Sequence, residues 1–302
     1  MRNKTPGLKQ QARNILQSKL SIGESKHFDK QFGDTSNKIY SWGTYRSYHD
    51  AVNHFCDYLK ENHSDVKNFE DGKQYINEYL QSRMDKGLSP YTVKLDANAL
   101  GKVYEMSTKD MVQTNSRYRE NITRSREEVT RDRHFSVEKN KELVNFCQCT
   151  GLRRSELETL KPNQLIYNHD LSRYELSIKG KGGRERIAPI IGSQEQVKMV
   201  VERIERTPDD EKVWGKVHSA CDVHSYRSEY ATRYYESIAR PIDELRAIKN
   251  TEGTYKVSSE IYACRKDLKG VYYDKKAMLE VSQALGHNRI SVIAEHYLRG
   301  GE

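Results

Sequence analysis

Six side chains in the second half of the chain have the types that breaking and rejoining a phosphodiester bond requires. A tyrosine that attacks phosphorus forms a covalent phosphotyrosine, which keeps the bond energy available for rejoining. Arginine suits phosphate oxygens because it stays charged and its planar fork matches their geometry. Histidine transfers protons near neutral pH. In chain order, the candidate residues are Arg153, Lys181, His224, Arg227, His287 and Tyr297.

Each of these residues also has an ordinary structural explanation when it is taken alone. Lys181 lies between two glycines and could belong to a plain basic turn. His287 follows a glycine and could cap a helix, while Tyr297 is one of 20 tyrosines and could pack a terminal helix. His224 and Arg227 are three residues apart and share a face if their segment is helical. The combination, rather than any single residue, favours one site.

The composition of the whole chain favours a polyanionic partner. Its 302 residues suffice for about two domains. The formal net charge of +8 and the pI near 9.0 favour nucleic acid first and a membrane surface second. There is no apolar run long enough for a transmembrane helix, and the polar start does not resemble a signal peptide. The five cysteines are irregularly spaced and form no metal-binding set, so we expect free thiols, a cytoplasmic location, and neither metal nor cofactor.

The first part of the chain predicts a small helical domain. Residues 1–40 are polar and basic, with an amphipathic stretch that predicts either a first helix or a flexible arm. Residues 41–114 predict an all-helical domain, because apolar residues recur at helical spacing and Ser89-Pro90 is a suitable helix start. Residues 115–135 carry dense charge and few apolar side chains, which is typical of an exposed linker; a solvated helix face is the alternative for part of it.

Residues 136–302 predict a mixed domain, so the whole chain is expected to be mainly α-helical with small β-hairpins. Ser136 could cap a helix that Gly151 ends, and Glu156 lies close enough to orient Arg153 or a neighbouring residue. Two hairpins are expected from alternating apolar residues and glycine turns. The expected hairpin strands are 174–178 with 184–190, and 257–265 with 271–273. The other expected helices cover residues 155–160, 193–206, 276–284 and 291–298.

The ordered motifs resemble the tyrosine recombinase family, which includes the lambda-integrase-like and Xer-type enzymes. "TGLRRSELETL" looks like the first-arginine motif and assigns Arg153 rather than Arg154. "IKGKGGRERIAPI" is similar to the hairpin that carries the family's lysine, "HSYRSEYAT" to the His-x-x-Arg motif and "LGHNRISVIAEHY" to the final motif. The helical part, with "SPYTVKLDANAL", resembles the family's core-binding domain.

The resemblance implies a role for each candidate residue. Tyr297 would attack the scissile phosphate and form a 3′-phosphotyrosine, and both arginines would bind the phosphate oxygens. Lys181 would protonate the leaving 5′ oxygen. His224 would assist proton transfer at the tyrosine, and His287 would donate a hydrogen bond to the phosphate. No metal is required by this chemistry.

The chain departs from the family pattern in three places. His287 and Tyr297 are ten residues apart, one more than the usual spacing, and His296 stands next to the tyrosine. His287 follows Arg227 by 60 residues, which indicates an insertion at about residues 238–274. That insertion could contact DNA or another subunit, or be an inert surface feature. The sequence after Tyr297 is short, so contacts between subunits would have to come from elsewhere, such as the insertion, or the tail has been trimmed.

The expected protein is a site-specific DNA recombinase or integrase, favoured as part of a mobile genetic element because of the insertion. Its two domains would hold double-stranded DNA at specific sites, as a homotetramer during strand exchange and with a possible accessory excision factor. One alternative is a type IB topoisomerase-like enzyme that relaxes DNA alone. The other is a non-catalytic DNA-binding protein with the same fold. The target DNA sequence follows no motif in the chain.

Overall fold

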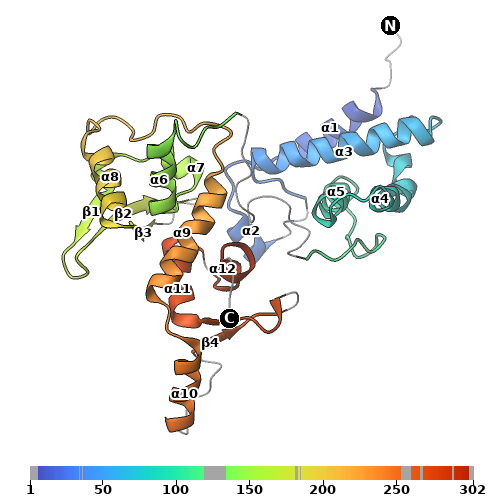
Figure 1. Cartoon of the computed structure of the whole chain (residues 1–302). Helices are drawn as coiled ribbons and strands as arrows, with labels where there is room; N and C mark the ends of the chain where they lie inside the picture. The colour runs from blue at the N-terminus through green and yellow to red at the C-terminus, as the bar shows by residue number, and fades with distance from the viewer. Residues whose placement is uncertain are drawn as a thin grey trace. The chain divides into compact units, whose positions relative to one another are not determined.

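The computed structural model describes residues 6–33, 35, 37–118, 134–180, 183, 185–252, 260–265, 268–287 and 289–298. The chain divides into two compact units, Met1–Asn121 and Ile122–Glu302, which are described separately. In Figure 1 the first unit is blue to green and the second is green to red. Most of the predicted linker, and Lys181, lie outside the described residues. The functional assignment of each domain stays a prediction.

In its described residues the first unit is helical. Ser41 begins the longest helix, because its hydroxyl accepts a hydrogen bond from the Thr44 amide. Ser89 and Pro90 begin another helix, as the sequence predicted. The elements are α1 (Leu8–Ser18), α2 (Lys26–Phe32), α3 (Trp42–Asn62), the 3₁₀ turn η1 (Glu70–Tyr75), α4 (Ile76–Asp85) and α5 (Pro90–Val103).

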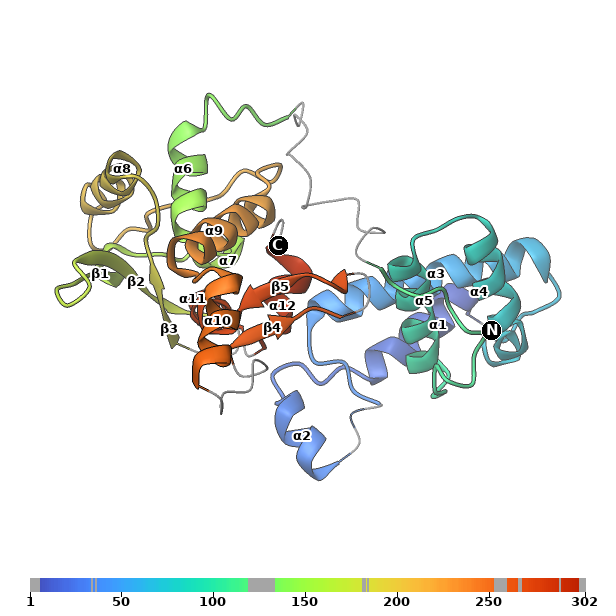
Figure 2. The same ribbon diagram turned by 60° about the horizontal axis from the view of Figure 1, so that its bottom comes forward.

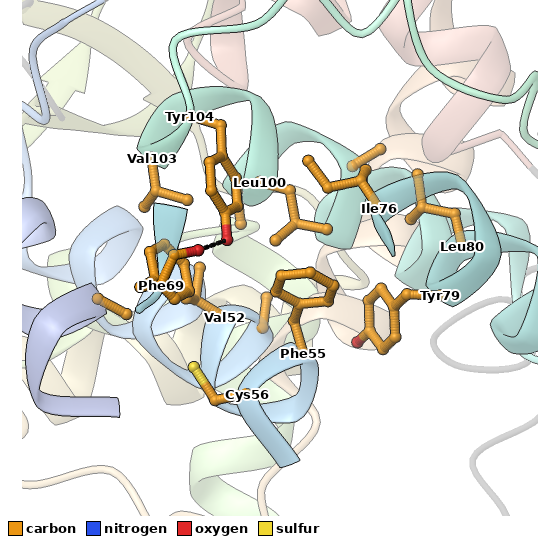
Figure 3. Packing of buried hydrophobic residues seen from close by; sticks show 14 of the residues in the cluster. Val52, Phe55, Cys56, Phe69, Ile76, Tyr79, Leu80, Leu100, Val103 and Tyr104 are labelled. Atoms are coloured by element: carbon orange, nitrogen blue, oxygen red, sulfur yellow. Dashed lines mark hydrogen bonds between the residues drawn. The ribbon is translucent and has the colours of Figure 1, made fainter. Parts of the chain in front are cut away.

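Aromatic rings fill the core of this first unit (Figure 3). Phe69 and Tyr104 stack with centroids 4.7 Å apart, and Phe55 packs edge-on against both. The Tyr104 hydroxyl donates a 2.6 Å hydrogen bond to the Phe69 carbonyl, which satisfies a buried polar group. Ala12 and Leu16 of α1 belong to the same core, so the amphipathic stretch near the start of the chain is a packed helix.

The second unit combines helices with two small antiparallel sheets, and the β1–β3 sheet lies at its edge (Figure 2). The three-stranded sheet has the order β1-β2-β3, with Ser177 opposite Ile187, and the two-stranded sheet pairs β4 with β5. The elements are α6 (Lys141–Thr150), α7 (Arg154–Leu157), η3 (Pro162–Gln164), β1 (Leu165–Asn168), β2 (Arg173–Lys179), β3 (Glu185–Pro189), α8 (Gln194–Glu205), α9 (Val223–Ile238), α10 (Ile242–Glu252), β4 (Ile261–Ala263), β5 (Tyr272–Asp274), α11 (Lys275–Ala284) and α12 (Ser291–His296).

The predicted fold class, mainly α-helical with small hairpins, is confirmed, and the structure differs from the prediction at several local points. Ser136 does not cap a helix: its hydroxyl accepts from the Lys139 amide and closes a turn, and α6 begins at Lys141. Strand β1 was not expected, and it gains its regular pairing only from β2. Among the described residues, no helix has both the length and the apolar composition needed to cross a bilayer. All five cysteines are buried free thiols.

Helix α9 contributes side chains to both of the large hydrophobic clusters in the second unit. Tyr226 packs in the cluster around Phe146, whereas Tyr230 packs in the cluster that includes Met278 and Ile293. The helix therefore contacts both α6 and α11. Because α6 leads to Arg153 and α11 leads to His287, this packing fixes the helix that carries His224 and Arg227 between the two other motifs.

Gly151 ends α6 in a conformation that favours glycine, with φ of 58°. A Cβ added there would lie 2.3 Å from the Tyr230 ring. Gly151→Ala is expected to lower the free energy of unfolding by roughly 3 kcal/mol or more, since backbone strain and overpacking add. Gly183→Ala is the control, because Gly183 has φ of 76° and its Cβ would meet only Lys179 Cε at 3.9 Å. Its cost should be about 1–2 kcal/mol; equal losses in chemical denaturation would contradict the packing argument.

Candidate active site

The predicted site residues that the structure describes converge in the second unit. Arg153 precedes α7, His224 and Arg227 lie on α9, His287 lies between α11 and α12, and Tyr297 ends α12. A pocket of about 310 Å³ is lined by Arg153, Arg154, Cys221, Asp222, Val223, His224, Arg227 and Tyr297. His287 joins them through a hydrogen bond to Tyr297.

Arg153 is oriented by the glutamate three residues later, as its spacing predicted. The Arg153 amide donates to Glu156 Oε2 at 2.8 Å, and Arg153 Nη1 donates to Glu156 Oε1 at 2.7 Å. Arg153 Nη2 also donates to the Leu285 carbonyl at 3.1 Å. The side chain is still 31% exposed and lines the pocket, so its remaining N–H groups can reach a bound anion.

The neighbouring Arg154 has a different environment. Its guanidinium donates to four main-chain carbonyls between α8 and α9, at distances of 2.6 to 3.3 Å. These carbonyls belong to Val217, His218, Ser219 and Cys221. Arg154 therefore ties the α7 turn to the loop that delivers His224, while Arg153 faces the pocket.

A third arginine, which the sequence reading missed, completes the cluster. Arg186 on β3 donates from Nη1 and Nη2 to the two carboxylate oxygens of Glu156, at 3.0 and 2.8 Å. Burial by itself would raise the pKa of Glu156, but the hydrogen bonds from Arg186 and Arg153 outweigh it and lower that pKa to about 2. Glu156 is therefore a stable anion shared by two arginines.

The carboxyl end of α11 receives all three guanidinium groups. Arg186 Nε donates to the Ala284 carbonyl at 2.7 Å, and Arg153 and Arg227 both donate to the Leu285 carbonyl. A helix carboxyl end carries partial negative charge and exposes unpaired carbonyls, so it holds cations without a carboxylate. The arginines are thus fixed in place while the cluster keeps an excess of positive charge.

Arg227 is 2% exposed and contacts Tyr297 directly. Its Nη1 donates to the Gly151 carbonyl, and its Nε lies 3.4 Å from the Tyr297 hydroxyl. The guanidinium carbon is 5.4 Å from the centroid of the tyrosine ring. Burial lowers the pKa of Arg227, although arginine keeps its charge at neutral pH. A fixed positive charge at this position can stabilise negative charge on the atoms that surround the tyrosine oxygen during a reaction.

Two histidines flank Tyr297 in different ways. His287 Nε2 lies 3.1 Å from the tyrosine hydroxyl, whereas the His224 ring packs edge-on against the tyrosine ring at 5.5 Å between centroids. His287 was expected at a helix start. It lies instead in the turn after α11, where Gly286 has φ of 68° and the His287 amide donates to the Ser282 carbonyl. The turn aims the imidazole at the tyrosine.

Burial and the nearby arginines lower the pKa of His287 to about 4, from a usual value of 6.5. As pH falls from about 6.5 to about 4, the unfolded chain takes up this proton before the folded protein does, so stability is lost in that window. His287→Asn is expected to remove part of this loss, measured as the change in Tm between pH 7 and pH 4.5. His169→Asn, in the exposed β1–β2 turn, is the control. Identical pH dependence in both variants and wild type would contradict the assignment.

The fold and the site together define a class of protein: a helical unit followed by a mixed unit, in which an arginine-lined pocket holds a tyrosine hydroxyl. No family model matches the chain. The tyrosine recombinase XerC of Staphylococcus carnosus (strain TM300) is 29% identical over 171 residues, covering 50% of this chain. The aligned part spans about half the length of this curated relative, 55%.

Two solved structures of the XerH site-specific recombinase share the fold. The post-cleavage complex with palindromic difH substrate has a TM-score of 0.52 and 15% identity, covering 96% of this chain and 90% of that one. The pre-cleavage complex with difH substrate has a TM-score of 0.50, with the same identity and coverage. The chain thus resembles a tyrosine recombinase in sequence over about half of its length and shares its fold with the XerH structures, and this supports the resemblance that its motifs indicated.

Proposed function

We propose that the protein is a site-specific DNA recombinase that cuts and rejoins strands through a 3′-phosphotyrosine at Tyr297. One observation carries the proposal: the Tyr297 hydroxyl lies within 3.4 Å of Arg227 Nε and 3.1 Å of His287 Nε2, in a pocket that Arg153 also lines. The side chains proposed as the nucleophile, its proton acceptor and two phosphate ligands therefore lie close together. Relatives named as recombinases support the same reading.

The proposed reaction begins with attack of the tyrosine oxygen on phosphorus. The bond from that oxygen to phosphorus forms, the bond from phosphorus to the 5′ oxygen breaks, and the hydroxyl proton passes to an imidazole. His287 Nε2 lies within hydrogen-bond distance of the hydroxyl, and its lowered pKa leaves the imidazole neutral at neutral pH, so it can accept a hydrogen bond from the hydroxyl. His224 is the second histidine proposed to assist. Lys181 is proposed to protonate the 5′ oxygen.

The two proposed phosphate ligands keep N–H groups available. Arginine has five N–H donors. Arg227 uses one on Tyr297, one on Gly151 and one on Leu285, which leaves two. Arg153 uses one on Glu156 and one on Leu285, which leaves three. Preorganised donors of this kind stabilise the charge that develops on the phosphate oxygens, each contributing on the order of 3 kcal/mol.

The wider assembly belongs to the same proposal. Specific double-stranded DNA sites, a synaptic homotetramer and an accessory excision factor are the proposed partners, and a mobile element is the proposed context. The insertion at 238–274 supports that context; its described part forms α10 and the β4–β5 sheet. Free thiols support action in the cytoplasm.

The test is to capture the covalent intermediate on DNA that flanks the gene. Protein is mixed with suicide substrates cut from that DNA, the reaction is stopped with detergent, and the adduct is digested and sequenced by mass spectrometry. A nucleotide on the peptide that contains Tyr297 supports the proposal. Efficient relaxation of plasmids that lack the flanking DNA would instead favour the topoisomerase reading. Tight binding without any adduct would favour a non-catalytic DNA-binding protein.

A further inference from the structure

We infer, on the basis of the proposed function, that Arg186 is a positioning residue that keeps Arg153 available for the phosphate. Arg186 does not line the pocket, and its side chain is buried. From β3, its Nη1 and Nη2 groups donate hydrogen bonds to Glu156, and its Nε donates to the Ala284 carbonyl at the end of α11.

Arg186 and Arg153 both donate hydrogen bonds to the carboxylate of Glu156. Glu156 Oε1 accepts from Arg153 Nη1 and Arg186 Nη1, and Oε2 accepts from the Arg153 amide and Arg186 Nη2. The Arg186 and Glu156 side chains are only 6% and 4% exposed, so water cannot replace either partner easily. Without Arg186, the carboxylate would have one guanidinium left to pair with, because Arg153 is the other donor in reach. A bidentate Arg153–Glu156 pair would neutralise the cation that the phosphate needs.

The second contact of Arg186 reaches the turn that carries His287. Its Nε donates to the Ala284 carbonyl, and a Cβ on Gly286 would lie 3.0 Å from Arg186 Cδ. The Arg186 side chain therefore packs against the glycine turn just before His287. Arg186 therefore connects β3 both to the Arg153 motif, through Glu156, and to the turn that carries His287.

Arg186 also pairs the two strands that precede and follow Lys181 in the chain, because on β3 it lies opposite Ile178 of β2. Its hydrogen bonds to Glu156 therefore hold this part of the sheet beside the Arg153 motif. We expect substitution of Arg186 to slow cleavage more than it weakens DNA binding, because the cations would be displaced rather than removed.

The test compares Arg186→Lys with Arg173→Lys. Arg173 makes a similar pair in the same sheet, with Nε 2.7 Å from Glu175 Oε1, and does not line the pocket. Lysine keeps the charge but cannot make the forked contact with Glu156. At saturating suicide substrate, the rate constant for adduct formation should fall on the order of 10- to 100-fold in Arg186→Lys, as misplaced catalytic groups commonly cause. It should stay within about threefold in Arg173→Lys, with DNA affinity and Tm similar in both. Equal rate losses in the two variants would overturn the inference.

A second readout separates this inference from the proposed function. Side-chain NMR signals of the Arg153 guanidinium, assigned with Arg153→Lys, report its mobility in the folded protein without any DNA. They should shift and broaden in Arg186→Lys and stay unchanged in Arg173→Lys. If wild type forms no adduct, the proposed function fails and these signals still decide the inference. Unchanged Arg153 signals in a folded Arg186→Lys protein would refute it.

Discussion

A Tyr297→Phe variant is expected to form no covalent protein–DNA adduct, while binding the same DNA within a few-fold of wild type. The substitution removes the attacking oxygen and its hydrogen bonds to Arg227 and His287. The ring keeps its packing against His224 and His287, so the fold and the pocket should persist. Adducts are counted on denaturing gels with a suicide substrate, and binding is measured by fluorescence anisotropy.

Tyr235→Phe is the matched control for this experiment. The Tyr235 hydroxyl accepts a 2.8 Å hydrogen bond from the Asp274 amide and does not line the pocket. Its loss should cost about 1 kcal/mol of stability and leave adduct formation intact. An adduct that survives in Tyr297→Phe would mean that the nucleophile is another residue, and His296 would be examined first because it is adjacent.

An Arg153→Ala variant is expected to lose cleavage by roughly 10²- to 10³-fold, the usual consequence of removing one preorganised donor. Binding should fall much less, because one cation among many contributes to DNA affinity. Glu156 keeps both bonds from Arg186, so the buried carboxylate is still paired and folding should be preserved. Single-turnover cleavage and anisotropy on the same substrate separate the two effects.

Arg154→Ala provides the contrasting variant one residue away. Removing its guanidinium takes one donor from each of four carbonyls, although those of His218 and Cys221 keep a main-chain donor. The main effect should therefore be a lower Tm, by several degrees, rather than a selective loss of chemistry. If Arg154→Ala abolished cleavage at unchanged Tm, and Arg153→Ala did not, the assignment of the two arginines would be reversed.

The motifs predicted five of the side chains that converge, because each motif is short and its members are local; the sixth predicted residue, Lys181, lies outside the described residues. Gly151 predicted the turn before Arg153, and the spacing of His224 and Arg227 predicted a shared helix face, which α9 provides. The fold class followed from helical spacing in the first part and alternation in the second. The roles of the site residues stay predictions until the variants above are measured.

Arg186 was missed for a physical reason. In β3, Arg186 lies on the same side as the buried Ala188, whereas Ile187 between them is 46% exposed. Hydrophobicity alone would predict that Ile187 is buried and that Arg186 is exposed to solvent. The guanidinium of Arg186 can be buried because it pairs with Glu156 and with the Ala284 carbonyl, which are 30 and 98 residues away in sequence. Contacts at such separations leave no local pattern.

The carboxyl end of α11 has a consequence for how this site can vary. Its acceptors for the arginines are main-chain carbonyls, so they belong to a position along the helix rather than to a kind of side chain. An α-helix advances 1.5 Å and turns about 100° for each residue. Deleting one residue from α11 would carry the carbonyls away from all three guanidinium groups at once. The length of α11 therefore sets the position of the three guanidinium groups, and the identity of the side chains along the helix affects that position less.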